Sequence, residues 1–457
     1  MDNPYEPPAA FPAAAEKPAG TTAIRSSAST REIVAWALCD WANSAYSTLL
    51  ITIVVSYLQA FVLSGDAGIL AYGWGLGVSM FISAWLSPIL GAMADARANK
   101  RTWLLCTSYT GAACSVLMGV VPPDWQYGPA VFMALFFLAS LAFELSFSFY
   151  NGFLPEIADE ASMNRVSGYG YAAGYFGGGL ALAVAIAVLS IGSGFGLSTE
   201  TGLRIGLVIM GVWWATFTLP AAFLLYDRNP PRGTALSFGE TARQAIREVL
   251  HTLRGVRSYS VLALFLLGFL FYNEGIQTVM SQASVFAREV LKMTPGELGM
   301  VVLMIQFVAT PAALGVGWLG DRLGAKTTLL ACLAIWCGLL IAAFFTTTKT
   351  QFWYLGIVLA MVMGGTQSIS RAIMGSMTPT AKTAEFFGFF NLSCRATSMF
   401  GPILFAQVLV WTKSANLAIL SLLIFIVAGA AIALCVNLPR GIQQAKADTI
   451  PTPTTDP

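Results

Sequence analysis

The sequence predicts an all-α membrane protein whose twelve transmembrane helices form two parallel six-helix repeats. First, 56% of the 457 residues are hydrophobic and only 11% are charged, whereas soluble domains carry about 25% charged residues. Second, apolar segments of about 20 residues, the length that crosses a bilayer, recur along the chain. Third, short polar motifs of the first half reappear at matching positions in the second half.

The apolar segments define the expected spans. Each is long enough to cross the hydrocarbon core of a bilayer as a helix. The spans are 33–63, 70–94, 102–121, 129–154, 166–192, 203–226, 258–286, 298–320, 326–346, 352–375, 384–411 and 416–437. Their even number places both termini on the same side of the membrane.

The basic residues predict which side this is, because cytoplasmic loops carry an excess of Lys and Arg. Only five of the 25 Lys and Arg residues fall in loops on the side opposite the termini: Arg204, Arg288, Lys292, Lys349 and Lys413. We therefore expect both termini to be cytoplasmic.

The spans divide the chain into two halves, 31–226 and 258–437. Residues 1–30 are rich in Pro, Ala, Ser and Thr and lack apolar periodicity, so we expect a disordered cytoplasmic tail. Residues 438–457 are polar and are expected to form a second such tail. Residues 227–257 are the longest connection and form the expected cytoplasmic linker.

The linker pattern predicts an amphipathic helix. Ser237 and Glu240 have the spacing of a capping box. Apolar residues then recur at helical spacing, with arginines among them: Phe238, Ala242, Ile246, Val249, Leu250, Leu253 and Val256. This pattern favours a helix at the cytoplasmic membrane surface. A regulatory or partner-binding helix is the alternative.

A carboxylate lies inside the first span. Asp40 is followed at helical spacing by Asn43, Ser44 and Ser47, which places these polar side chains on one face. An ionised side chain in the middle of a membrane helix costs roughly 2.5–3.5 kcal/mol on insertion scales. Such a stripe has to face a partner or a water-filled path. We therefore assign it to a pathway for protons or substrate.

The seventh span repeats this pattern. Glu274 is followed by Gln277 at i+3, just as Asp40 is followed by Asn43. Ionisable residues within a membrane span are functional candidates by default. The alternative is a permanent ion pair that only fastens helices together, and we favour function for both carboxylates.

Spans 4 and 11 also carry charged residues. For Glu144, a functional role and a protonated, hydrogen-bonded structural role fit the sequence equally well. Arg395 shares its helix face with Asn391 at i−4. A guanidinium binds a carboxylate through two parallel hydrogen bonds, which suits the α-carboxylate of an amino acid. The alternative for Arg395 is a fixed pair with Glu274 or Glu144.

A Gly-x-x-x-Asp motif followed by basic residues ends span 2 and again ends span 8. Its members are Gly91, Asp95, Lys100 and Arg101 in the first half, and Gly317, Asp321, Arg322 and Lys326 in the second half. An aspartate at the same helix end in both halves suits a charge clasp that holds one face shut. We therefore predict a cytoplasmic gate at these residues.

Arg371 is expected at the cytoplasmic end of span 10, as a member of this gate. Its candidate partners are Glu156, Asp159 and Glu160, which follow span 4. Gln367 lies four residues earlier and shares the face of Arg371. We therefore expect Gln367 to line the pathway above the gate.

Several longer motifs identify a family resemblance. They are DWANSAY (40–46), NGFLPEIADE (151–160), SGYGYAAGYFGGG (167–179), GGTQSISRA (364–372) and EFFGFFNLSCRATSMFGP (385–402). With the repeated Gly-x-x-x-Asp motif, they resemble the vacuole-effluxer family of the major facilitator superfamily, from about Trp36 to Leu438. This family includes vacuolar amino-acid effluxers of fungi and many bacterial transporters. The short linker resembles the bacterial members, which implies the bacterial cytoplasmic (inner) membrane.

We therefore expect a transporter and not an enzyme. It would move a small polar solute by alternating access, coupled to protons, with amino acids suggested by the resemblance alone. A metabolite or drug exporter is one alternative, and a non-transporting membrane receptor or scaffold is another. The expected partners are the solute, protons and the lipid bilayer, without nucleic acid, and the expected state is a monomer. The seven cysteines and the single His251 show no metal-ligand spacing, and we expect no cofactor.

Overall fold

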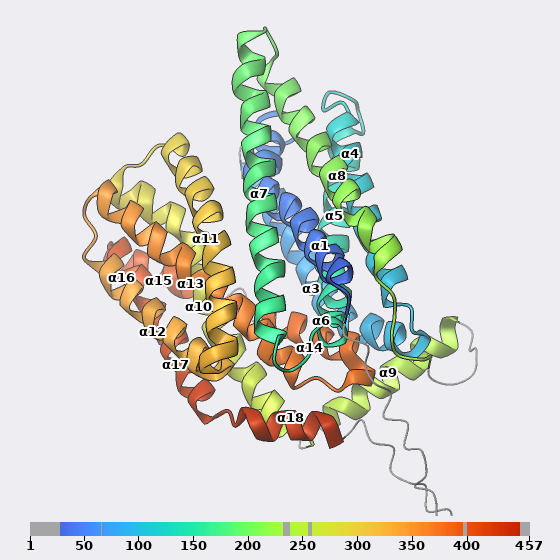
Figure 1. Cartoon of the computed structure of the whole chain (residues 1–457). Helices are drawn as coiled ribbons and strands as arrows, with labels where there is room; N and C mark the ends of the chain where they lie inside the picture. The colour runs from blue at the N-terminus through green and yellow to red at the C-terminus, as the bar shows by residue number, and fades with distance from the viewer. Residues whose placement is uncertain (1–27, 65, 232–237, 255–257, 396–399, 448–457) are drawn as a thin grey trace, which may run out of the picture.

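The computed structural model describes residues 28–64, 66–231, 238–254, 258–395 and 400–447. Within these residues the secondary structure is helical, without β-strands, and twelve helical segments are long and apolar enough to cross a membrane (Figure 1). Each of the twelve overlaps one expected span. The all-α, twelve-helix prediction is therefore confirmed.

Six spans form the first half. The first span begins with α1 and continues through two π-helical turns, and α6 is a short helix after the fourth span. The elements are α1 (Thr30–Leu49), η1 (Leu50–Val54), α2 (Val55–Tyr57), η2 (Leu58–Val62), α3 (Asp66–Arg97), α4 (Lys100–Val120), α5 (Gly128–Gly152), α6 (Leu154–Ile157), α7 (Met163–Gly194) and α8 (Thr199–Leu224).

The other six spans form the second half. Its eleventh span is described as α14 and α15, because residues 396–399 lie outside the described residues. The elements are α10 (Ser260–Leu291), α11 (Pro295–Leu323), α12 (Ala325–Phe344), α13 (Lys349–Ser376), η3 (Thr380–Lys382), α14 (Thr383–Arg395), α15 (Phe400–Thr412), α16 (Ala415–Ser421), α17 (Leu423–Cys435) and α18 (Leu438–Ala447).

Helix α18 corrects the prediction that 438–457 is a disordered tail. Leu438 and Ile442, one helical turn apart, pack against the core of the second half. The segment is polar on average, but these two apolar side chains on one face are enough to dock it. The rest of that tail, and residues 1–27 of the other one, lie outside the described residues.

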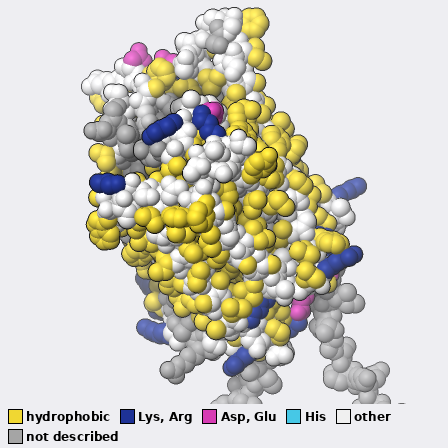
Figure 2. Space-filling view, turned by 90° about the vertical axis from the view of Figure 1, so that its left-hand side faces the viewer, with side chains coloured by type: hydrophobic (Ala, Val, Ile, Leu, Met, Phe, Trp, Pro, Cys, Tyr) yellow, Lys and Arg dark blue, Asp and Glu magenta, His cyan; other side chains and the backbone are white. Residues whose placement is uncertain are grey.

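Each half has its own hydrophobic core. In the first half, the rings of Tyr46, Phe143 and Trp214 lie together between α1, α5 and α8. The second half buries Phe269 and Tyr272 of α10 in the same way. Figure 2 shows that hydrophobic side chains dominate the middle of the outer surface in that view, as expected of a surface that faces lipid.

The linker helix α9 (Phe238–Arg254) lies at the same end of the bundle as α18 (Figure 1). We call this end the linker end and the opposite one the far end. Ala245 and Val249 are buried against Met93 of α3 and Phe389 of α14. One face of α9 therefore packs on both halves. The expected cap residue Ser237 lies outside the described residues, as does Val256.

The two halves meet closely at the linker end, through α3 with α14 and α7 with α11. A Cβ placed on Gly91 would collide with the backbone carbonyl of Ala384 in α14. A Cβ placed on Gly317 would lie 2.8 Å from the carbonyl oxygen of Asn164 in α7. Both glycines belong to the repeated Gly-x-x-x-Asp motif, and in both places a missing side chain lets two backbones approach.

Candidate functional site

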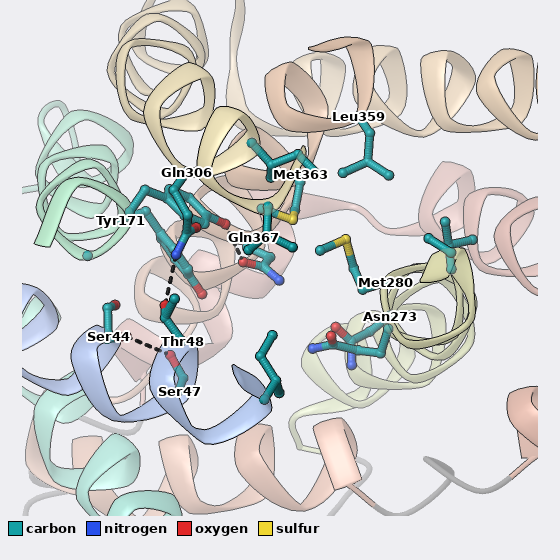
Figure 3. Close-up of a pocket in the computed structure, with 18 of the residues that line it drawn as sticks. Ser44, Ser47, Thr48, Tyr171, Asn273, Met280, Gln306, Leu359, Met363 and Gln367 are labelled. Atoms are coloured by element: carbon teal, nitrogen blue, oxygen red, sulfur yellow. Dashed lines mark hydrogen bonds between the residues drawn. The ribbon is translucent and has the colours of Figure 1, made fainter. Parts of the chain in front are cut away.

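A cavity of about 560 Å³ lies between the two halves, within the size range of about 300–1,000 Å³ typical of ligand sites. Figure 3 shows part of its lining. Ser44, Ser47 and Thr48 of α1 lie across the cavity from Asn273 and Met280 of α10. The helices α7, α11 and α13 contribute further residues: Tyr171, Gln306, Leu359, Met363 and Gln367.

Asp40 and Arg371 form one buried ion pair between the halves. Arg371 Nη1 lies 3.2 Å from Asp40 Oδ2, and Tyr150 donates a hydrogen bond to the same oxygen over 3.0 Å. Asp40 is 4% exposed and lines the cavity, whereas Arg371 is 1% exposed. A helix of each half therefore contributes one charge to a pair that is almost completely shielded from water.

Arg371 has further partners in the first half. Its Nε donates to Ser167 Oγ over 2.9 Å, its Nη2 to the Ser167 carbonyl over 2.6 Å, and its Nη1 also to Asn151 Oδ1 over 3.2 Å. The guanidinium also lies 4.1 Å from the ring centre of Tyr171 and 4.9 Å from that of Trp36. Arg371 is thus held by hydrogen bonds, an ion pair and cation–π contacts together.

Arg371 does not contact the acidic residues that we proposed as its partners. Glu156 contacts Lys100, and Glu160 accepts a hydrogen bond from Lys446 over 2.8 Å. Asp159 accepts a hydrogen bond from Ser162, which lowers the pKa of the Asp159 carboxyl. The side chain of Arg371 points toward α1 and α7, so those partners were wrong.

Glu144 and Arg395 form a second ion pair between the halves. Arg395 Nε donates to Glu144 Oε2 over 3.0 Å and Nη2 to Oε1 over 2.8 Å, which is a bidentate arrangement. The Glu144 side chain is 1% exposed, whereas that of Arg395 is 19% exposed, and both residues line the cavity. Of the two partners proposed for Arg395, the structure selects Glu144.

Three amide side chains also connect the halves around the cavity. Gln306 of α11 donates to Thr48 Oγ1 over 2.8 Å, and the Tyr175 hydroxyl of α7 donates to Gln367 Oε1 over 2.9 Å. Asn391 of α14 donates to Ser87 Oγ over 2.9 Å. Every one of these hydrogen bonds joins one half to the other, so a relative movement of the halves rearranges the polar lining of the cavity.

The structure brings together most of the residues predicted for the pathway. The members that line the cavity are Asp40, Glu144, Gln277, Gln367, Asn391 and Arg395. Asn43 is buried but does not belong to the lining, since it is turned about 60° from Asp40 around the helix axis, away from Ser44. Glu274 accepts a hydrogen bond from the Gly401 N–H over 2.6 Å, within the second half, and does not belong to the lining either.

Sequence reasoning missed several residues of the cavity. Gln306 is a polar residue in the apolar eighth span, and the rule that drew attention to Asp40 also applies to it. Asn273 lines the cavity although its neighbour Glu274, which we selected, does not. The amide spacing placed Glu274 and Gln277 on one face but could not show which side of the helix turns inward.

The first-half motif forms a buried charge cluster at the linker end. The ammonium group of Lys100 contacts Glu156, donates to Thr383 Oγ1 over 2.6 Å and lies 3.7 Å from Asp95 Oδ1. Asp95 Oδ2 accepts a hydrogen bond from the Glu385 N–H over 2.9 Å. Since Thr383 and Glu385 begin α14, this cluster ties the second half to the first.

Arg101 lies outside this cluster. Its Nη1 donates to the Leu225 carbonyl over 3.0 Å, so it caps the C-terminal end of α8 in its own half. A neighbouring pair, Arg228 and Glu32, lies 2.7 Å apart. Asn229 bridges the halves, because its amide donates to Glu156 over 2.8 Å and to the Thr380 carbonyl over 2.6 Å.

The second-half motif has different contacts. Asp321 Oδ2 lies 3.7 Å from Arg165 Nε at the start of α7, which again joins the halves. Arg322 stacks on Trp318, with 4.1 Å between its guanidinium carbon and the ring centre. Lys326 donates to the carbonyls of Leu434 and Val436 over 2.7 and 2.8 Å, within its own half. The two motifs therefore use equivalent aspartates but different cations.

Comparisons with known proteins identify the family to which the chain is similar. The chain matches the family model described as "Vacuole effluxer Atg22 like" over residues 69–446. It is 30% identical over 413 residues to the uncharacterised MFS-type transporter YxiO of Bacillus subtilis (strain 168), covering 88% of this chain and 93% of YxiO. It is 28% identical over 262 residues to Autophagy-related protein 22-1 of Neosartorya fischeri, covering 52% of this chain and 42% of that protein. The matched region is thus less than half of the fungal relative.

Solved structures are similar in fold. The proton:xylose symporter XylE bound to 6-bromo-6-deoxy-D-glucose superposes with a TM-score of 0.70 at 14% identity, covering 92% of this chain and 98% of XylE. The major facilitator superfamily transporter FucP in the outward conformation gives a TM-score of 0.67 at 15% identity, covering 89% and 98%. The chain belongs to the vacuole effluxer Atg22-like family and is a transporter of the major facilitator superfamily.

Proposed function

We propose that this transporter moves a small polar solute, with amino acids as the first candidates, by alternating access coupled to protons. The observation that carries the proposal is the pair of charge contacts beside the cavity. Asp40 and Glu144 come from the first half, and their partners Arg371 and Arg395 come from the second half. A solute or proton that changes either carboxylate therefore changes a contact between the halves.

Alternating access requires the linker end to open in another state. In the state described here, the Lys100 cluster and the contacts of Gly91 and Gly317 hold that end together. Opening it separates Asp40 from Arg371. Breaking a buried pair by removing one partner costs about 3–5 kcal/mol, because the other charge is left uncompensated. A proton on the carboxylate reduces that cost, which supports proton coupling.

The basic residues support a cytoplasmic linker end. Arg243, Arg247 and Arg254 are exposed on α9, and Lys446 is exposed on α18. Cytoplasmic loops carry such an excess of positive charge. The similarity to YxiO of Bacillus subtilis supports a bacterial cytoplasmic membrane. We therefore propose that both termini are cytoplasmic and that the cavity belongs to an outward-facing state.

The cavity lining supports two solute classes. The charged groups at Asp40, Glu144 and Arg395 suit a zwitterion such as an amino acid. The apolar wall that includes Met280 and Met363 favours a solute with a sizeable apolar part. A metabolite or drug exporter is therefore the second candidate.

Reconstituted protein tests the proposal. Liposomes that contain the transporter are given an equimolar mixture of the twenty labelled protein amino acids, with and without a pH gradient. We expect a subset of the amino acids to accumulate with the gradient and to equilibrate after a protonophore is added. Ligand binding without any flux would identify a receptor instead. Flux of apolar drugs alone would favour the exporter.

A further inference from the structure

The two ion pairs beside the cavity differ in their access to it. Arg371 is 1% exposed and does not belong to the cavity lining, and its guanidinium is bonded to Ser167 and Asn151 as well as to Asp40. The Arg395 side chain is 19% exposed and lines the cavity. A solute in the cavity can therefore reach Arg395, whereas α1, α5 and α7 enclose Arg371.

The geometry at Arg395 resembles that of a carboxylate-binding site which is already occupied. Its Nε and Nη2 hold both oxygens of Glu144 over 3.0 and 2.8 Å. One edge of a guanidinium accommodates one carboxylate in this bidentate way. A second carboxylate that arrives from the cavity can take this edge only if Glu144 leaves it.

Glu144 has little else to stabilise its charge. Among the described residues, Arg395 is the one charged side chain within ion-pair distance of Glu144. Asp40 lines the same cavity from α1. A carboxylate that is 1% exposed and has lost its arginine is costly to keep ionised, so it takes up a proton instead.

We propose that Arg395 binds the carboxylate of the transported solute by exchange, that the displaced Glu144 takes up one proton from the water in the cavity, and that the Asp40–Arg371 pair stays closed as a latch during this exchange. The inference rests on the proposed transport function and narrows the solute to one that carries a carboxylate. It also predicts that one proton is bound for each solute carboxylate bound.

Chemical rescue tests the exchange without any transport. Glu144→Ala removes the carboxylate and leaves room beside Arg395, and acetate supplies a replacement. We expect Glu144→Ala to lower the Tm of the purified protein, and acetate to raise it again by roughly 2 °C or more, because a ligand that binds the folded form stabilises it. Chloride at equal ionic strength should not raise the Tm of Glu144→Ala. The double variant E144A/R395A should lose the response to acetate.

Asp40→Ala is the matched control, because it removes the other carboxylate from an inter-half pair. Arg371 keeps Ser167 and Asn151 and offers Asp40 only its Nη1, so acetate should rescue this variant much less. Equal rescue of both variants, or no specific rescue of Glu144→Ala, would overturn the inference. If Glu144→Ala does not fold, Glu144→Gln is used instead in the proton-uptake measurement, because it keeps the shape of the side chain and cannot take up the proton; uptake should then be lost.

Proton uptake gives a second, independent measurement. In weak buffer with a pH indicator, the equimolar amino-acid mixture should bind to the wild type with uptake of protons, and the matching mixture of amino-acid amides should not. Acetate rescue without amino-acid flux in liposomes would leave the carboxylate site standing and remove amino acids as the solute. Flux without acetate rescue or proton uptake would leave transport standing and remove the exchange.

Discussion

Asp40 and Arg371 are 331 positions apart in the chain, and their side chains lie 3.2 Å apart between the two halves of the bundle. Both are almost fully buried, and Tyr150 donates a hydrogen bond to the same oxygen that Arg371 contacts. The pair therefore exists only while α1 and α13 stay together. Its strength contributes to the stability of this conformation relative to one that is open at the linker end.

Asp40→Asn should shift the conformational equilibrium toward opening at the linker end. Asparagine keeps the shape but leaves Arg371 without its counter-charge, at a cost of about 3–5 kcal/mol for a buried group. Two spin labels at the linker end, one in each half, should lie farther apart on average in Asp40→Asn than in wild type. Glu297→Gln is the control, because Glu297 and Lys349 form an exposed pair within the second half. This variant should leave the distance between the labels unchanged. Equal distances in Asp40→Asn and wild type would argue against a latch.

Gly91→Ala should separate α3 from α14. The added methyl group meets the backbone carbonyl of Ala384 and lies 2.8 Å from the Glu385 nitrogen, so the helices have to move apart. Cross-linking of a cysteine pair at Met93 and Phe389 should fall in yield. Gly338→Ala in α12 is the matched control, because a Cβ there meets nothing within 4 Å. That variant should keep the yield and gain roughly 0.5–1 kcal/mol of helix stability.

Lys100→Met and Arg101→Met should differ although the residues are adjacent. Lys100 is 1% exposed and faces Glu156, Asp95 and Thr383, so its loss leaves buried carboxylates without a counter-charge. Arg101 donates to a carbonyl of its own half. Thermal unfolding should show a Tm lowered by several degrees for Lys100→Met and by about 1 °C or less for Arg101→Met. Similar losses in both variants would show that the Lys100 cluster does not fasten the halves.

Helix α9 should release its contact with the bundle when its buried face becomes charged. Val249→Asp places a carboxylate against Met93 and Phe389, whereas Ile246→Asp changes a side chain that is 44% exposed. Limited proteolysis should cut the linker faster in Val249→Asp than in wild type, and equally fast in Ile246→Asp and wild type. Equal protection of both variants would place α9 at the lipid surface without a role for the bundle contact.

The spans could be predicted from the sequence because the bilayer imposes a fixed length and a low charge content on each helix. The positions of Gly91 and Gly317 could be predicted as well, because the same motif occurs at the end of two spans. The contacts of the basic residues that follow these glycines could not be predicted. Lys100 turns into the cluster and Lys326 turns to the end of α17, and only the packing of neighbouring helices decides between these directions.

Most members of the site could be predicted, but of its two ion pairs only Glu144 with Arg395 was among the expected alternatives. A charge inside a span shows that a partner exists, but the partner lies on another helix, hundreds of positions away, as with Asp40 and Arg371. Gln306 and Asn273 were overlooked because neither lies three or four positions from a charged residue, which is the spacing that selected the other amides. Asn43 was included because helical spacing gives a face only to within about 60°, which is the difference between the cavity and the interior of the first half.

Uptake driven by a pH gradient in liposomes tests the central claim, which is that carboxylates paired between the halves couple protons to transport. Wild type should accumulate its solute, whereas Asp40→Asn and Glu144→Gln should exchange solute across the membrane without accumulating it, since exchange needs no net proton movement. Glu274→Gln, a buried carboxylate outside the cavity lining, should still accumulate. Full accumulation by both Asp40→Asn and Glu144→Gln would contradict the claim and place proton coupling elsewhere.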